Sequence, residues 1–290
     1  MLSSFGIADV TRSPTKVLTL SMTGLTNGIR VEDIQGLGPV PAQVSMADFS
    51  FADGARYQSA RRSGRNIVLK LGLEPGLLTA AAMRRQLYSF LAPKAYREIR
   101  LTHVDYGIIV VKGWIESNEP DIFTKDPIQV ISILTEEPDF VTQGTTQISQ
   151  LSTTSSQPAS LSTPSSSNAV FTYEGTAGSG IEVDLVASAA INTLDLYAFR
   201  DNAVSQRMAL TDLNMVTGDR LIITTDNGSK NIRRLKTNNA NQPALDSLVV
   251  SLSKWIELLD GQYNFYIRQP AGTVTQHAYI LRFQTRYVSI

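Results

Sequence analysis

The chain of 290 residues contains no cysteine and only two histidines. Without cysteine it has no disulfide, no thiolate metal site and no thiol nucleophile. Two histidines alone are too few for a zinc site, so no metal or cofactor is expected. No stretch approaches the roughly 20 apolar residues that span a bilayer, so no membrane insertion is expected. The first residues lack a basic segment followed by an apolar core, so no signal peptide is expected either.

The chain also lacks an excess of charge of either sign. Lysine plus arginine and aspartate plus glutamate both number 26, so the net charge is zero. Long-range attraction to DNA or to an anionic membrane is therefore not indicated, and no sequence-specific nucleic-acid binding is expected. Neutrality leaves little repulsion between copies, which permits self-association. The length suffices for two domains.

The central segment of the first half predicts a strand followed by the one convincing helix of the chain. Residues 65–73 place Ile67 and every second residue up to Leu73 on one apolar face, which is typical of a strand on a core. Thr79 is expected to cap a helix that reaches residue 92, where Pro93 stops it. The apolar stripe of this helix comprises Ala80, Met83, Leu87, Phe90 and Leu91.

The rest of the first half reads as short strands separated by turns. Strands are predicted at residues 16–23, 29–34, 42–51, 98–104, 108–115 and 128–134. A hairpin turn is expected at Asp105-Tyr106-Gly107. Residues 53–64 are polar and carry several arginines, so they are predicted to be an exposed loop.

A change of composition separates the two halves. Residues 142–168 are nearly all small or polar, and such a segment cannot offset its own ordering entropy, so we predict a Ser/Thr-rich flexible linker. The predicted domains are residues 1–141 and 169–290. The second half contains many short alternating strands, and Asp226-Asn227-Gly228 gives the strongest hairpin signal. The fold class predicted is mainly β, with two β-sandwich domains, the first containing one α-helix.

No set of residues predicts catalysis. His103 lies in phase with buried strand positions, which favours a half-buried structural role, and His277 lies in a strand of the other domain. The glycine-rich residues 175–180 suggest a phosphate loop, but a strand and not a helix follows them, which favours an ordinary loop. Glu136-Glu137 with Asp121 suggests a glycosidase pair, but solvated charges are the simpler interpretation.

Two further groups suggest binding rather than chemistry. Arg61, Arg62 and Arg65 are able to grip phosphate, but a zero net charge favours a loop that pairs with the acids of a neighbouring subunit. Trp255 and Tyr263 suggest a sugar platform, although large aromatics serve more often in a core. Since no nucleophile, base and acid come together, the chain is not expected to be an enzyme.

In the order and spacing of its elements, the chain resembles the distal tail proteins of tailed bacteriophages. In the first half the resemblance rests on residues 64–69, the helix at 79–91, the hairpin at Gly107, and residues 128–134 leading into Glu137-Pro138-Asp139-Phe140. In the second half it rests on residues 171–176, 218–223, 226–230 and 255–265.

The resemblance implies a structural role in the virion, at the tail tip or baseplate. It implies a first domain that closes into a hexameric ring and a galectin-like second sandwich on the outside. The ring would join the tail tube protein to the tail hub and to receptor-binding or fibre proteins, leave a channel for DNA, and assemble in the host cytoplasm. A galectin sugar site is not found around Trp255, so the label implies shape. The alternative is a two-module carbohydrate-binding protein that uses the second sandwich.

Overall fold

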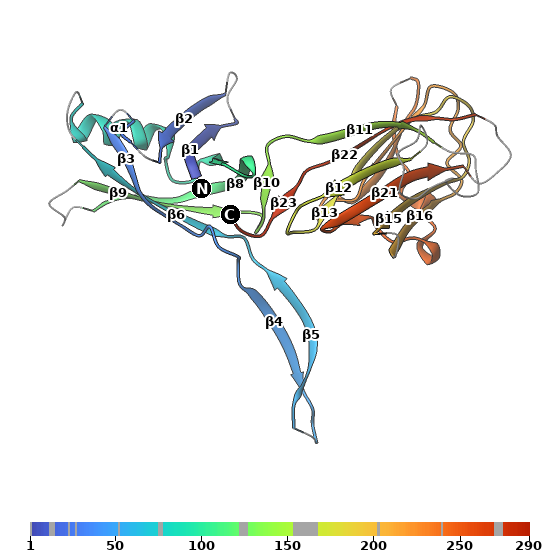
Figure 1. The fold of residues 1–290 in the computed structure, drawn as a ribbon, viewed down its shortest axis with the longest axis horizontal. Coiled ribbons are helices and arrows are strands. Elements are labelled where there is room, and N and C mark those ends of the chain that lie inside the picture. The colour runs from blue at the N-terminus through green and yellow to red at the C-terminus, as the bar shows by residue number, and fades with distance from the viewer. Residues whose placement is uncertain are drawn as a thin grey trace. The chain divides into compact units, whose positions relative to one another are not determined.

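The computed structural model describes residues 2–11, 15–22, 24–26, 28–51, 53–74, 78–121, 127–152, 168–201, 204–238, 240–269 and 275–290. The chain divides into two units, and the first comprises Met1–Gln143 together with Tyr287–Ile290. The second comprises Gly144–Arg286. Both are built mainly of strands, which confirms the predicted mainly β fold class (Figure 1).

The first unit is organised around one large antiparallel sheet with the strand order β2-β1-β7-β8-β9-β6-β3. The strands, in chain order, are β1 Leu2–Asp9, β2 Lys16–Ser21, β3 Ile29–Gln35, β6 Asn66–Leu73, β7 Tyr96–His103, β8 Gly107–Asp121, β9 Ile128–Thr135 and the short β10 Phe140–Thr142. Strands β2 and β3, at opposite ends of this order, contact each other, so the sheet curls around its own core. The predicted hairpin turn between β7 and β8 is confirmed, with Gly107 at φ +67°.

Helix α1, Ala80–Phe90, closes this core. The hydroxyl of Thr79 accepts a hydrogen bond from the amide of Ala82 at 3.2 Å, which confirms the predicted cap. Met83, Leu87 and Leu91 are fully buried among the strand residues. The predicted helix is therefore confirmed, although it ends at Phe90 and not at residue 92, and of its predicted stripe Ala80 and Phe90 are only half-buried.

The second unit is a β-sandwich of two antiparallel sheets. One has the order β11-β22-β14-β17-β18-β19 and the other the order β12-β21-β15-β16. Their bounds are β11 Thr146–Leu151, β12 Ala169–Tyr173, β14 Glu182–Val186, β15 Leu194–Arg200, β16 Val204–Leu210, β17 Arg220–Thr224, β18 Asn231–Leu235, β19 Asn241–Pro243, β21 Gly261–Arg268 and β22 Ala278–Phe283. A two-stranded piece pairs β13 Ser179–Gly180 with β20 Glu257–Leu258, and two single-turn helices are η1 Leu245–Ser247 and η2 Val250–Leu252.

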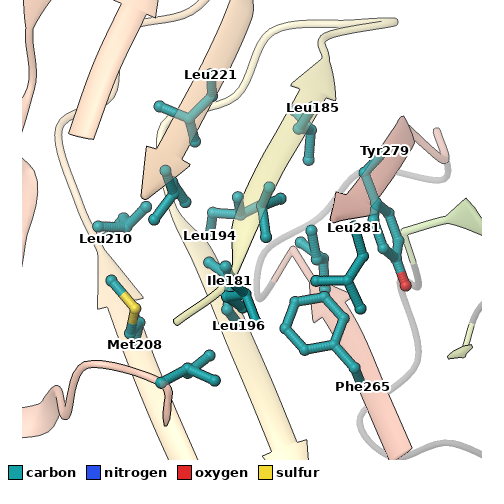
Figure 2. Close-up of a cluster of buried hydrophobic side chains, with 14 of the residues drawn as sticks. Ile181, Leu185, Leu194, Leu196, Met208, Leu210, Leu221, Phe265, Tyr279 and Leu281 are labelled. Atoms are coloured by element: carbon teal, nitrogen blue, oxygen red, sulfur yellow. The ribbon is translucent and has the colours of Figure 1, made fainter. Parts of the chain in front are cut away.

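Side chains alternate between the two faces of these strands, and those on the inner faces fill the sandwich core. Leu196 and Phe265 come from one sheet, and Leu185, Leu221 and Leu281 come from the other; all five are fully buried (Figure 2). The predicted hairpin at residues 226–228 is confirmed between β17 and β18, with Gly228 at φ +85°.

Three segments differ from the sequence-based expectation. Tyr287–Ile290, predicted as the end of the second domain, belongs to the first unit. Thr146–Leu151, inside the predicted linker, forms β11 and pairs with β22 in the second unit. Its only inward apolar side chain that packs on the core is Ile148, so composition hides the strand. The predicted exposed loop at 53–64 contains β5, Ala55–Arg62, which pairs with β4, Ala42–Asp48.

Candidate interaction surface

The residues considered for catalysis are dispersed. His103 lies in β7, half-buried, where its Nδ1 accepts a hydrogen bond from the amide of Asp105 at 3.2 Å and its ring stacks on Tyr106. His277 belongs to the second unit and is fully buried just before β22. Among the described residues no group of three histidine, aspartate or glutamate side chains is placed to hold a metal ion. No helix in the described part of the chain is long and apolar enough to cross a membrane.

His277 is held as a neutral ring. Its Nδ1 accepts a hydrogen bond from the amide of Ser188 at 3.1 Å, so the proton lies on Nε2, which donates to Oε1 of Gln269 at 2.8 Å. Burial lowers the pKa of His277 below its usual value of 6.5, because charging the ring there would cost desolvation. The ring therefore ties three segments of the sandwich together.

In the glycine-rich residues 175–180, glycine allows a close approach between backbone segments. A Cβ on Gly180 would lie 2.2 Å from the Cα of Asp226, so the backbone passes close to the β17–β18 turn. Strand β14 follows, and the loop interpretation agrees with this geometry.

The proposed glycosidase carboxylates are not brought together as a described pair. Glu136 accepts hydrogen bonds from Nε1 of Trp114 at 3.2 Å and from the hydroxyl of Tyr96 at 3.4 Å. Burial, with Glu136 beside it, raises the pKa of Tyr96. The Asp121 side chain lies outside the described residues.

The aromatic pair of the second unit serves the core. Trp255 packs partly buried against the core, and Tyr263 is buried, with its hydroxyl accepting from the amide of Leu259 at 2.8 Å. An aromatic row that sequence reasoning missed lies on the opposite face of β15 and β21, where Tyr197, Phe199 and Tyr266 stack in nearly parallel planes. Its signal was the alternation of these residues with core positions.

The arginines behave differently from the prediction. Arg65 is 2% exposed and donates five hydrogen bonds of 2.5–3.1 Å to the backbone carbonyls of Gly36, Gly38, Pro138 and Val288. Its guanidinium lies 3.9 Å from the centroid of the Phe140 ring. Burial lowers the pKa of Arg65 to about 10, partly opposed by Asp139, so it stays charged at neutral pH.

Arg62 also finds its partner within the chain. Its Nη2 lies 2.8 Å from Oδ2 of Asp139, and its Nη1 contacts the other carboxylate oxygen, so the pair is bidentate. The prediction that Arg62 and Arg65 pair with acids of a neighbouring subunit is therefore wrong for these two residues.

The feature left without a partner is the hairpin of β4 and β5, which we call the arm. The two strands pair only with each other and extend from β3 and β6 of the large sheet (Figure 1). Nearly every residue of both strands is exposed. Large apolar side chains are among them: Val44 is 57% exposed, Met46 53% and Tyr57 58%, and Phe51 at the tip is fully exposed.

The arm is amphipathic. Side chains alternate between the two faces of a strand pair, and the register pairs Val44 with Ala60 and Met46 with Tyr57. A bulge between Ser45 and Met46 keeps these four side chains on one face. The other face carries Gln43, Ser45, Ala47, Arg56, Ser59 and Arg61. Such alternation is usual in strands with one face buried, but here the apolar face is exposed.

A second exposed apolar surface lies on the outer face of the large sheet, and we call it the Trp114 surface. Tyr96, Trp114 and Leu134 are cross-strand neighbours in β7, β8 and β9. Trp114 is 48% exposed and Leu134 43%. Glu116 and Glu136 are exposed beside them, and Glu116 accepts from the hydroxyl of Ser132 at 2.7 Å.

The fold matches that of a solved phage protein. No protein-family profile matches the chain, and no curated protein matches it in sequence. A crystal structure of the Dit protein of phage SPP1, described as a paradigm of the hub adsorption apparatus in phages infecting Gram-positive bacteria, superposes with a TM-score of 0.60 at 14% identity. The match covers 97% of this chain and 98% of that one.

A structure of the phage P2 baseplate in its activated conformation with calcium aligns over all of both chains, with a TM-score of 0.48 and 9% identity. The equivalent strontium structure gives 0.46 and 8%, covering 99% of each chain. The chain thus shares the fold of the SPP1 protein along nearly its whole length.

Proposed function

We propose that this protein is a structural component of a bacteriophage tail tip or baseplate. The observation that carries the proposal is the shared fold with SPP1 Dit over both units, because a match confined to one sandwich would indicate only a common architecture. The absence of cysteine and the zero net charge agree with a scaffold that assembles without disulfides. In this role the chain is not an enzyme.

The finer proposal is that six copies form a ring. The first unit would make the ring, which joins the tail tube to the hub and receptor-binding proteins and leaves a channel for DNA. The second unit would be a galectin-like sandwich on the outside. Its support is the resemblance in the order of elements together with the exposed arm, which requires a covering surface.

The test is the position of the protein in the virion. Antibodies against the purified chain, coupled to gold, should label the tail end distal to the capsid in electron micrographs of the phage. Labelling along the whole tail or on the capsid, or none on disrupted virions, would refute the role.

A second candidate is carbohydrate binding by the second unit. The aromatic row Tyr197, Phe199 and Tyr266 favours it, since Arg207 lies beside it and pairs with Asp195 at 2.9 Å. It ranks lower because the rings stack on one another, and Arg207 lies over the Tyr197 ring at 5.6 Å, leaving little open ring face for a sugar. Binding on a glycan array that Tyr197→Ala abolishes would support it.

A further inference from the structure

The residues Tyr287–Ile290 follow the second unit in the chain but belong to the first unit, and we call them the strap. Tyr287 is 7% exposed, and its ring centroid lies 4.5 Å from that of Tyr106 in the β7–β8 turn. The amide of Ile290 donates to the carbonyl of Leu37 at 3.3 Å, and its side chain packs against the core of the first unit. The strap therefore completes the fold of the first unit.

One buried side chain joins the strap to the root of the arm. Arg65 donates from Nη2 to the carbonyl of Val288 at 2.8 Å, and from Nη1 to the carbonyl of Gly38 at 3.1 Å, in the segment that leads into β4. Its Nε donates to the carbonyl of Pro138, just before β10, at 2.8 Å. Because Arg65 is 2% exposed, undocking of the strap leaves a buried guanidinium without one of its acceptors. The root of the arm and the start of β10 therefore depend on the strap.

Folding of the second unit brings the strap to its place. Only residues 143–145 separate β10 from β11, and only residues 284–285 separate β22 from the short strand β23, Arg286–Tyr287. Since β11 pairs with β22, with Thr146 opposite Phe283, the folded second unit delivers β23 to β10, with which it pairs. Without that pairing, the same contact would have to close a loop that contains the whole second unit, and the entropic cost of closing a loop rises with its length.

We propose that the strap makes closure of the first unit, and of the root of its arm, depend on the folding of the second unit. When the second unit is folded, the strap docks at little entropic cost. When the second unit is unfolded, the strap dissociates, β10 loses its contact with β23, and Arg65 loses the carbonyl of Val288. For a component that assembles in several copies, this coupling keeps a chain with an unfolded second unit from presenting a closed first unit.

Hydrogen exchange of the full-length protein, followed by mass spectrometry and read at β10, tests the coupling. In Ile223→Asp, which unfolds the second unit, we expect the amides of β10 to exchange at least tenfold faster than in the wild type. Val250→Asp places the same charge on a residue of the same unit that is 79% exposed, and should leave the exchange unchanged. If β10 exchanges at the wild-type rate while the strands of the second unit exchange freely in Ile223→Asp, the proposal is wrong.

A second pair of variants alters the strap and leaves the second unit intact. Tyr287→Ser/Ile290→Ser removes the two apolar side chains of the strap that pack on the first unit. Exchange in β10 should again become at least tenfold faster, while exchange in β22 stays as in the wild type. Ser289→Ala, in the same segment, is the matched control and should exchange as the wild type does. Unchanged exchange of β10 in the double variant would overturn the role of the strap.

The wild type in increasing urea gives an independent measurement should Ile223→Asp precipitate. We expect β10 to lose its protection at the urea concentration at which β22 loses its own. Loss of protection in β10 together with β6, and not with β22, would contradict the coupling. The coupling is a property of the single chain and is measured without assembly, so its failure would leave the proposed tail-tip role standing.

Discussion

Two hairpins of this chain have the same alternation of apolar and polar residues, but the apolar face of one is buried and that of the other is exposed. The β17–β18 hairpin points Leu221, Ile223 and Ile232 into the sandwich core, where all three are fully buried. The arm points Val44 and Met46 into solvent. Alternation therefore says that a face will be covered, but not whether the cover comes from the same chain. In the proposed assembly, the difference separates residues that stabilise folding from residues that stabilise the contact between copies.

The largest expected effect comes from placing the same charge in each hairpin. Ile223→Asp buries an unpaired carboxylate and should destabilise the second unit by about 4 kcal/mol or more, enough to unfold it. Val44→Asp should change the free energy of unfolding by less than about 0.5 kcal/mol, because its side chain stays solvated. Denaturant unfolding followed by circular dichroism measures both. A comparable loss of stability in Val44→Asp would mean that the arm is covered within its own chain.

The next effect concerns the root of the arm. Arg65→Met removes the five hydrogen bonds of a buried guanidinium and leaves the four backbone carbonyls that it joins without this donor, which should cost the first unit about 3 kcal/mol. Arg61→Met, on the exposed part of the arm, is the matched control and should leave the melting temperature unchanged. If the two variants have the same melting temperature, the hydrogen bonds of Arg65 do not stabilise the root of the arm.

A pH dependence should distinguish the second unit. The pKa of His277 is lowered by burial, so the folded unit binds fewer protons than the unfolded chain. Stability is then complete above about pH 6.5, the ordinary value of a histidine, and falls as the pH drops below it. The urea concentration at the midpoint of unfolding of the second unit should decrease from pH 7.5 to pH 5.5. The decrease should be smaller in His277→Gln, and an equal decrease in that variant would assign the effect elsewhere.

The smallest effect concerns the two turns. Gly228→Ala places a side chain at φ +85° and should destabilise the second unit by about 1 kcal/mol. Gly54→Ala, at φ +107° in the turn of the arm, should leave the melting of the first unit unchanged, because the arm is not part of its core. Differential scanning calorimetry resolves the pair, and a shift for Gly54→Ala would couple the arm to the core.

The elements that could be predicted from the sequence are those whose apolar faces are buried within the chain. The strand Asn66–Leu73 and the helix α1 were predictable because their apolar faces are covered locally and leave a clear period. The β17–β18 turn was predictable because Asp226-Asn227-Gly228 is a strong hairpin signal. Strand β5 was missed because its arginines and exposed side chains read as a loop. Strand β11 was missed because its Ser/Thr-rich composition hides one inward isoleucine.

The candidate surface could not be predicted from the sequence, for a physical reason. Arg65 bonds to carbonyls as distant in sequence as that of Val288, and backbone acceptors leave no mark on residue type. The sequence likewise gives no signal that Tyr287–Ile290 belongs to the first unit. The apolar face of the arm is not covered by its own chain, and the sequence of one chain contains no pattern that identifies a partner.

The most direct test is the assembly state of the full-length protein. Native mass spectrometry across a range of concentrations, with electron microscopy of the same samples, measures it without a label. The account predicts a closed ring of six copies that the Val44→Asp variant fails to form. A wild-type chain that remains monomeric at every concentration, with its arm exposed, would contradict it.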